Sequence, residues 1–203
     1  MGSFFKKTGV TLLVLGLLYG GLLVVSRGDP VYFVQEKLSF GAWSQYDFII
    51  VDVAKKTGVD FYLIKAVIWQ ESRFGADKIG SSGERGLMQV TEPASADWAA
   101  ANNVANFDVE KLLDPKTNIL VGTWYLKRAL DHYRNKDRPI SFALTEYNAG
   151  RARVKRWIGK TNIGDTPMGA EEMREKSFDS TRSYVKSIEH RYEYYSKATA
   201  KLD

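Results

Sequence analysis

The sequence predicts a mainly helical domain that follows an N-terminal transmembrane helix. Three observations lead to this fold class. Apolar residues recur at spacings of three and four along much of the 203-residue chain, which is the period of an amphipathic helix. No strand signal of useful length follows residue 28, and no internal repeat is present. Residues 8–26 form an uninterrupted run without a single charged side chain.

The uncharged run is long enough to cross a membrane. As a helix, residues 8–26 would span about 28 Å, close to the roughly 30 Å hydrocarbon core of a bilayer. Two lysines precede it, which favours an N-terminus in the cytoplasm. A cleaved signal peptide is the alternative, but the residues after the run form a poor cleavage site. We expect an uncleaved membrane anchor in residues 1–27 and a juxtamembrane connector in residues 28–42.

The remaining residues, 43–203, are expected to form one helical domain. Several of its helices begin at clear signals, since Asp60 follows a glycine break and the Asp114-Pro115 pair supplies an N-cap with proline at N1. Residues 75–86 contain four glycines and two serines, so we expect a loop there, and residues 159–177 read as irregular. Helices are expected at 31–38, 43–56, 60–72, 91–101, 114–134, 140–147, 151–158 and 179–197.

Composition excludes several kinds of chemistry. The chain has no cysteine, which removes disulfides, thiol catalysis, cysteine zinc sites and a lipid-bearing N-terminal cysteine. The two histidines, His132 and His190, lie on separate expected helices without other ligands nearby, so no metal is expected. No nucleotide-binding fingerprint is present, and no cofactor is expected. The net charge of +5 is mild, and no nucleic-acid recognition module accompanies it.

The helix at 60–72 ends in a carboxylate that stands out. Its helical spacing places Glu71 at the end of an otherwise apolar face, formed by Phe61, Ile64, Val67 and Ile68. Loss of hydration there would disfavour the charged carboxylate and raise its pKa, as a general acid requires. The alternative is a helix-end glutamate that points into solvent.

Four short motifs then follow one another along the chain. They are ESRF at 71–74, GLMQ at 86–89, YNAG at 147–150 and TRSYV at 181–185. With these motifs in this order, residues 46–195 resemble the lytic transglycosylase domain of the SLT type, in the lysozyme-like superfamily. The resemblance implies a lysozyme-like helical fold and cleavage of the β-1,4 bond between N-acetylmuramic acid and N-acetylglucosamine in peptidoglycan.

The resemblance also implies a role for Glu71. In the family, the glutamate of the first motif protonates the glycosidic oxygen and then removes a proton from the muramic acid 6-hydroxyl, which closes a 1,6-anhydro ring without water. The N-acetyl oxygen of the substrate is thought to stabilise the cationic centre, so a second catalytic carboxylate is not required.

The same family positions imply a set of substrate-binding residues. Ser82 and Gln89 would bind hydroxyl and N-acetyl groups, and Met88 would form an apolar wall of the groove. Tyr147 and Asn148 would line the groove, and Tyr184 would lie near Glu71. Core packing is the alternative for the two tyrosines, and backbone capping is the alternative for Gln89 and Asn148.

Two acids depart from the family pattern. Glu146 precedes Tyr147, where the family usually has a small apolar residue, and Glu84 replaces a frequent alanine. Solvated surface charges are the simpler interpretation. If either acid faced the opposite side of the sugar, a hydrolysis that uses water and two carboxylates would become possible.

We therefore expect a membrane-anchored lytic transglycosylase that acts on peptidoglycan strands outside the cytoplasmic membrane of a bacterium. A hydrolytic muramidase of the same fold and a non-catalytic wall-binding module are the alternatives. Five positive charges in residues 151–160 favour a solvent-facing basic helix, or a contact with anionic wall polymer or lipid headgroups.

Overall fold

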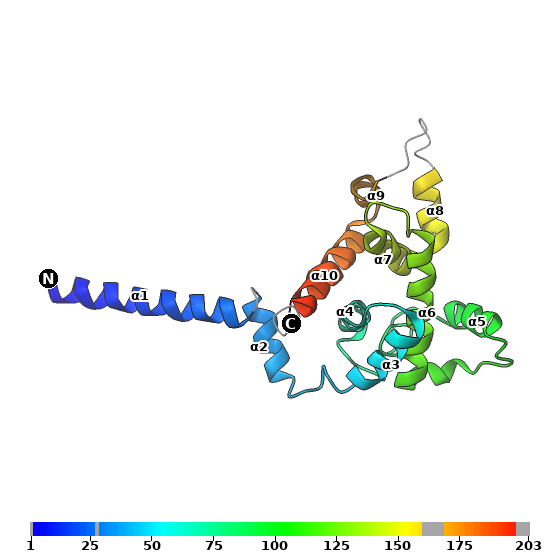
Figure 1. The fold of residues 1–203 in the computed structure, drawn as a ribbon, viewed down its shortest axis with the longest axis horizontal. Helices are drawn as coiled ribbons and strands as arrows, with labels where there is room; N and C mark the ends of the chain where they lie inside the picture. The colour runs from blue at the N-terminus through cyan, green and yellow to red at the C-terminus, as the bar shows by residue number, and fades with distance from the viewer. Residues whose placement is uncertain (1, 27–28, 160–168, 198–203) are drawn as a thin grey trace.

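The computed structural model describes residues 2–26, 29–159 and 169–197, with side chains from residue 11 onward (Figure 1). The described chain is mainly helical, as expected, and its only strand-like pairing consists of two isolated bridges from Arg85, to Ile79 and to Val90. The α-helices are α1 (Gly2–Val25), α2 (Pro30–Leu38), α3 (Asp47–Thr57), α4 (Phe61–Ser72), α5 (Glu92–Ala101), α6 (Pro115–His132), α7 (Pro139–Ala149), α8 (Arg151–Gly159), α9 (Ala170–Lys176) and α10 (Asp179–Ser196), and η1 (Val109–Leu113) is a short 3-10 helix.

Local capping sets several helix ends where the sequence predicts them. The carboxylate of Asp60 accepts hydrogen bonds from the backbone N–H groups of Tyr62 and Leu63, at 2.8 and 3.2 Å, and starts α4. Asp114 starts α6 in the same way, through the N–H of Thr117 at 2.8 Å. Gly58 ends α3 with a positive φ of 72°, a conformation that glycine adopts without steric cost.

Two elements differ from the expectation. Helix α3 starts at Asp47 and not at 43, because residues 43–46 form turns that place Trp43 against the core. Helix α9 lies within a segment expected to be irregular, and it buries Ala170 and Met173. A helix this short has little stability of its own, so it forms because its buried residues pack against the domain. The rest of that segment, at 160–168, lies outside the described residues.

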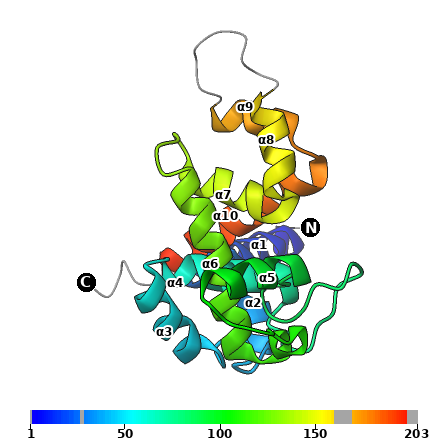
Figure 2. The same ribbon diagram turned by 90° about the vertical axis from the view of Figure 1, so that its right-hand side faces the viewer.

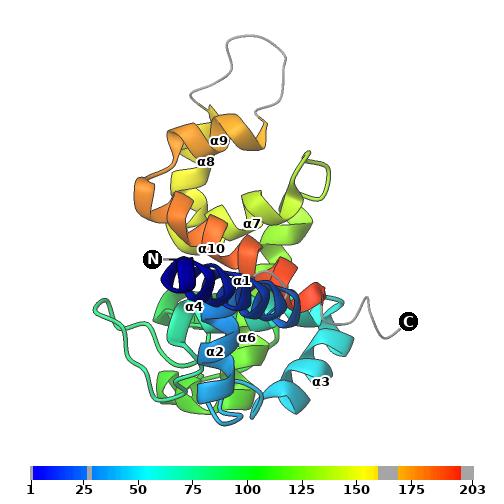
Figure 3. The same ribbon diagram turned by 90° about the vertical axis from the view of Figure 1, so that its left-hand side faces the viewer.

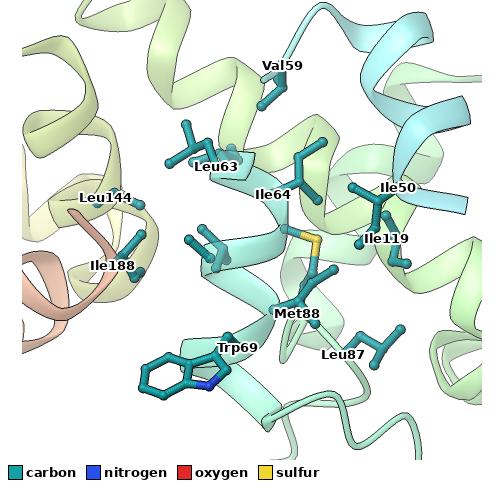
Figure 4. Close-up of a cluster of buried hydrophobic side chains, with 14 of the residues drawn as sticks. Ile50, Val59, Leu63, Ile64, Trp69, Leu87, Met88, Ile119, Leu144 and Ile188 are labelled. Atoms are coloured by element: carbon teal, nitrogen blue, oxygen red, sulfur yellow. The ribbon is translucent and has the colours of Figure 1, made fainter. Parts of the chain in front are cut away.

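Helix α4 runs through the centre of the domain. Residues 63–69 are buried on every side, whereas the sequence pattern indicated one apolar face. Figure 4 shows why: Ile50 and Ile119 pack on one side of α4, and Leu144 and Ile188 lie on the other. Even Lys65 is only 6% exposed, and its ammonium group pairs with the carboxylate of Asp47 at 2.7 Å.

A second, smaller buried cluster lies where α6, α7, α8 and α9 meet (Figure 2). Its residues are Ala129, Tyr133, Phe142, Ala143, Val154, Ala170 and Met173. Because Val154 is fully buried there, it fixes which face of α8 turns inward and leaves the basic residues of that helix toward solvent.

The segment expected as a juxtamembrane connector contains α2, which contacts the domain. Helix α1 projects away from the folded body (Figures 1 and 3), but Tyr32 of α2 is only 1% exposed and lies in the same buried cluster as α4. Its ring contacts Trp43 at a centroid distance of 5.1 Å and Tyr194 at 4.6 Å, and the guanidinium of Arg191 lies 3.2 Å from its centroid. The fold therefore includes α2.

Length and apolar character determine whether a described helix could cross a membrane. No single one combines the length and apolar character needed to cross a bilayer alone. Thr11–Val25 and Pro30–Leu38 meet that requirement only as a pair, with a bend of 69° between them.

Candidate active site

Glu71 lies in the last turn of α4, and Tyr184 of α10 contacts it. The Tyr184 hydroxyl donates a hydrogen bond to Oε1 of Glu71 at 2.5 Å. Burial raises the pKa of Glu71 to about 7, while the Tyr184 hydrogen bond and the charge of Lys78 act in the opposite direction. The carboxyl group is therefore suited to exchange a proton near neutral pH.

Tyr184 itself remains a neutral donor. It is 7% exposed, and burial together with the Glu71 charge raises its pKa well above the ordinary value of 10. Helix α10 packs along α4, where the hydroxyl of Ser187 also donates to Oε1 of Gln70 at 2.6 Å. The packing of these two helices thus holds the Tyr184 hydroxyl at Glu71, across a sequence separation of 113 residues.

The GLMQ segment is held beside Glu71 by three other elements. The Ser72 hydroxyl donates to the carbonyl of Leu87 at 2.8 Å, and the Tyr147 hydroxyl donates to the carbonyl of Met88 at 2.9 Å. Buried Asn118 accepts from the N–H of Met88 and donates to the carbonyls of Arg85 and Leu112, each at 2.7 Å. Side chains on α4, α6 and α7 therefore fix this segment's backbone.

Gly86 allows the close approach of Asn118. Its φ is +73°, and a Cβ atom at this position would lie 2.4 Å from Nδ2 of Asn118 and 2.5 Å from the carbonyl oxygen of Leu112. Both distances are impossible for a real Cβ, so only glycine fits here.

A hollow of about 220 Å³ opens beside this segment. Gln89, Tyr147 and Asn148 line it, together with Tyr125 and Gly150. Three residues expected to bind substrate are thus brought to one depression. Tyr147 lies close enough to Glu71 for the Glu71 charge to raise its pKa, in addition to the larger effect of burial.

Two of these side chains also form hydrogen bonds within the protein, one to the loop backbone and one to helix α10. The amide nitrogen of Gln89 donates to the carbonyls of Lys78 and Gly86, at 3.1 and 2.9 Å. Oδ1 of Asn148 accepts from the Thr181 hydroxyl at 2.8 Å. These bonds orient both amides within the hollow.

Met88 and Ser82 stand apart from that arrangement. Met88 is 0% exposed, and its sulfur lies beneath the segment, 3.6 Å from the Thr123 hydroxyl oxygen. The expected apolar wall needs accessible surface, which this side chain lacks because it fills the core under Gly122. Ser82 is exposed on the loop, where its N–H donates to Oε2 of Glu84 at 3.0 Å.

The sequence matches a family model described as the transglycosylase SLT domain, over residues 48–167. The chain belongs to this family. The resemblance predicted from the four motifs is therefore confirmed, although the last motif, with Tyr184, lies beyond the matched residues.

Two SLT relatives show how far the similarity extends. The soluble lytic murein transglycosylase of Escherichia coli K12 is 30% identical over 124 residues, 61% of this chain and 18% of that protein. The membrane-bound lytic murein transglycosylase E of Buchnera aphidicola is 32% identical over 136 residues, 64% of this chain and 61% of that protein. The chain thus spans about a fifth of the length of its E. coli relative.

Solved SLT structures share the fold. An inactive mutant of lytic transglycosylase Slt from Pseudomonas aeruginosa aligns with a TM-score of 0.65 and 26% identity, over 77% of this chain and 25% of that one. A 70 kDa soluble lytic transglycosylase in complex with bulgecin A aligns with a TM-score of 0.67 and 26% identity, over 76% of this chain and 24% of that one.

The two unusual acids of this SLT domain have different surroundings. Glu146 is 1% exposed, and its carboxylate contacts the Tyr133 hydroxyl at 2.8 Å and Nδ1 of His132 at 3.3 Å. It therefore anchors the end of α6 and has no open face. Glu84 lies close enough to Glu71 for its negative charge to help raise the pKa of that residue.

Lys78 and Asn118 were not found by sequence reasoning. The Lys78 ammonium donates a hydrogen bond to the backbone carbonyl of Glu71, and its charge lowers the pKa of that residue. Asn118 is a polar residue among the apolar positions of α6. A polar residue at such a position was the signal for buried hydrogen-bond partners. Neither lies in one of the four motifs.

Proposed function

We propose that this SLT domain is a peptidoglycan lytic transglycosylase in which Glu71 acts first as general acid and then as general base. The names of the relatives support the reaction class, and the surroundings of Glu71 support the residue. The observation that carries the proposal is a partly buried carboxyl group, hydrogen-bonded by Tyr184, with a pKa of about 7.

In the proposed reaction, protonated Glu71 gives its proton to the oxygen of the β-1,4 bond between N-acetylmuramic acid and N-acetylglucosamine. The bond from that oxygen to the muramic acid anomeric carbon breaks, and the N-acetyl oxygen of the same sugar stabilises the cationic centre. Glu71 then removes the proton of the 6-hydroxyl, whose oxygen bonds to the anomeric carbon. The proton returns to Glu71, and water is not consumed.

The groove residues would position the strand. Ser82, Gln89, Tyr147 and Asn148 are polar or aromatic and at least partly accessible, which suits contacts with hydroxyl, N-acetyl and ring surfaces. Met88 would act indirectly, since its backbone carbonyl holds the Tyr147 hydroxyl.

Glu71→Gln tests the proposal directly. Turnover on isolated peptidoglycan should fall by about 10²–10⁴-fold, because the neutral amide cannot transfer the proton. Wild-type products should carry a 1,6-anhydro end, one water lighter than the hydrolytic product. If the variant remains as active as wild type, Glu71 is not the general acid. If wild type only binds walls, a non-catalytic binding module is the correct interpretation.

Hydrolysis is the second candidate, and the charge effect of Glu84 on Glu71 favours testing it at Glu84. Glu84 is the acid whose charge raises the pKa of Glu71, whereas Glu146 is enclosed by Tyr133 and His132. If Glu84 activates a water, Glu84→Gln should abolish activity and wild-type products should have free reducing ends. If transglycosylation is correct, activity should change only severalfold and the products should stay anhydro.

We further propose that residues 1–27 anchor the enzyme in the cytoplasmic membrane, with the domain on the outer, periplasmic side. The uncharged run supports this proposal, as do relatives described as membrane-bound. Full-length protein should remain with membranes at high salt, because apolar attachment is not screened by ions. A mature N-terminus at residues 25–30 would show a cleaved signal instead.

A further inference from the structure

A second, larger hollow lies beside the candidate active site. Its volume is about 560 Å³, and residues of α5, α6 and α8 line it together with the end of α7. Its charged lining residues are Asp97, Arg128, Arg151, Arg153, Lys155 and Arg156. Five cations and one anion thus surround one depression.

The single anion does not neutralise these cations. Asp97 pairs with Arg128 at 3.2 Å, and the guanidinium of Arg128 also stacks 4.3 Å from the ring centroid of Tyr125. Within the described part of the chain, no carboxylate lies at ion-pair distance from the four basic residues of α8. Lys155 and Arg156 are both exposed, so their charges are available to a ligand.

The basic hollow is continuous with the groove. Tyr125, Ala149 and Gly150 line both the basic hollow and the smaller hollow that contains Gln89 and Tyr147. Gly150 ends α7 with a φ of +82°, and α8 starts at the next residue. A strand that passes Tyr147 would therefore meet the basic residues immediately.

We propose that this basic hollow binds the carboxylates of the peptide stems on peptidoglycan, an inference that rests on the proposed function. Stem peptides hang from the lactyl groups of muramic acid and carry free carboxylates along a strand of otherwise neutral sugars. Guanidinium and ammonium groups recognise carboxylates through charge-assisted hydrogen bonds. The hollow would thus favour strands whose stems carry free carboxylates over strands whose stem carboxylates have been converted to neutral amides.

The position of the hollow favours the wall polymer over lipid headgroups. Helix α8 lies on the side of the domain away from α1 (Figure 1). If α1 is held in the membrane, the basic hollow faces away from the bilayer surface.

The test compares Lys155→Gln/Arg156→Gln with wild type in the full-length protein. The substrates are soluble glycan strands with free stem carboxylates and the same strands after carbodiimide coupling to ammonia, which converts these carboxylates to neutral amides and keeps the stems in place. We expect kcat/KM on the carboxylate-bearing strands to fall about three- to tenfold, as for the loss of two exposed ion pairs, with no change on the amidated strands. The control Lys55→Gln/Lys116→Gln removes two exposed charges elsewhere and should leave both rates unchanged.

A charge-retaining exchange and a binding assay complete the design. Lys155→Arg/Arg156→Lys should keep the preference for free stem carboxylates. In the Glu71→Gln background, sedimentation with untreated or amidated sacculi measures binding without turnover. An inactive wild type would overturn the proposed function, and this binding assay would still test the stem-peptide site. Equal losses on both substrates, or no loss on either, would overturn the stem-peptide site. The stem-peptide site would also be overturned if Lys155→Gln/Arg156→Gln kept the wild-type substrate preference but bound phosphatidylglycerol vesicles more weakly. That result would show that the hollow binds lipid.

Discussion

At the scale of single residues, the ionisation of Glu71 is set by opposing contacts. Burial raises its pKa to about 7, and the hydrogen bond from Tyr184 and the charge of Lys78 limit the increase. A general acid needs the protonated form at the pH of the reaction and must still give up the proton in the transition state. A pKa near neutrality satisfies both requirements.

The first prediction concerns the pH dependence of activity. If Glu71 is the general acid, the rate should fall as the pH rises through about 7, because the deprotonated carboxylate cannot protonate the leaving oxygen. Initial rates on soluble glycan strands between pH 5 and pH 9 would show this decrease. A rate that stays constant from neutral to alkaline pH would contradict the assignment.

The second prediction concerns stability. The folded-state pKa of Glu71 lies above the ordinary 4.5, so the folded protein binds more protons than the unfolded chain within this window. The contribution of Glu71 to the free energy of unfolding should therefore be greatest below pH 4.5 and should decrease as the pH rises to about 7. Because each pKa unit corresponds to about 1.4 kcal/mol, the full decrease is on the order of 3 kcal/mol.

Glu71→Gln isolates that contribution. The variant should lack this decrease and become more stable than wild type above pH 7, since a neutral amide replaces a partly buried charge. Urea unfolding of both proteins at several pH values measures the difference. A difference that does not change with pH would show that Glu71 titrates at its ordinary pKa.

At the scale of elements, the loop before α5 has its shape because other elements bind its backbone. Asn118 of α6 is 0% exposed and supplies two of these hydrogen bonds, with Met88 and Arg85, while a third joins it to the carbonyl of Leu112 in η1. Ser72 and Tyr147 add one each, from α4 and α7. A glycine-rich segment thus becomes ordered next to Glu71 without regular secondary structure of its own.

The third prediction tests this dependence. Asn118→Leu should lower the free energy of unfolding by about 3 kcal/mol, because buried backbone groups of Arg85, Met88 and Leu112 lose their partner. Asn102→Ala is the control, since exposed Asn102 bonds only to the carbonyl of its own helix. Urea unfolding measures both. Equal effects of the two substitutions would show that Asn118 does not hold the loop.

At the scale of the whole molecule, α2 joins the expected anchor to the domain through its packing. Tyr32 is enclosed by aromatic rings and Arg191, and Asp29 caps α2 and pairs with His190 at 3.0 Å. Tertiary contacts therefore hold Asp29 and α2 against the domain.

The fourth prediction compares two truncated chains. A chain that starts at residue 29 should be soluble and active on isolated walls, because it retains α2 and loses α1. A chain that starts at residue 42 loses Tyr32, and its free energy of unfolding should be lower by about 3–5 kcal/mol, as for removal of a large buried aromatic side chain. Thermal unfolding measures both. Equal midpoints would show that α2 does not support the domain.

The sequence by itself determined features that depend on neighbouring residues. Capping acts within one helical turn, so Asp60 and Asp114 marked the starts of α4 and α6 correctly. The four motifs identified the family, and helical spacing placed Glu71 at the end of an otherwise apolar helix face. The interior of α4 was only half predicted, because its second buried face depends on the packing of α10.

Only the tertiary structure decided which polar groups meet. The Tyr184 hydroxyl reaches Glu71 across 113 residues, and Asn118 reaches Met88 across 30, distances in sequence at which local patterns carry no information. The packing of α6 and α7 encloses Glu146, and the loop geometry brings the charge of Glu84 to act on Glu71. The folded arrangement sets the desolvation and neighbouring charges that fix the pKa of Glu71, so the sequence predicted its direction and the structure supplied its causes.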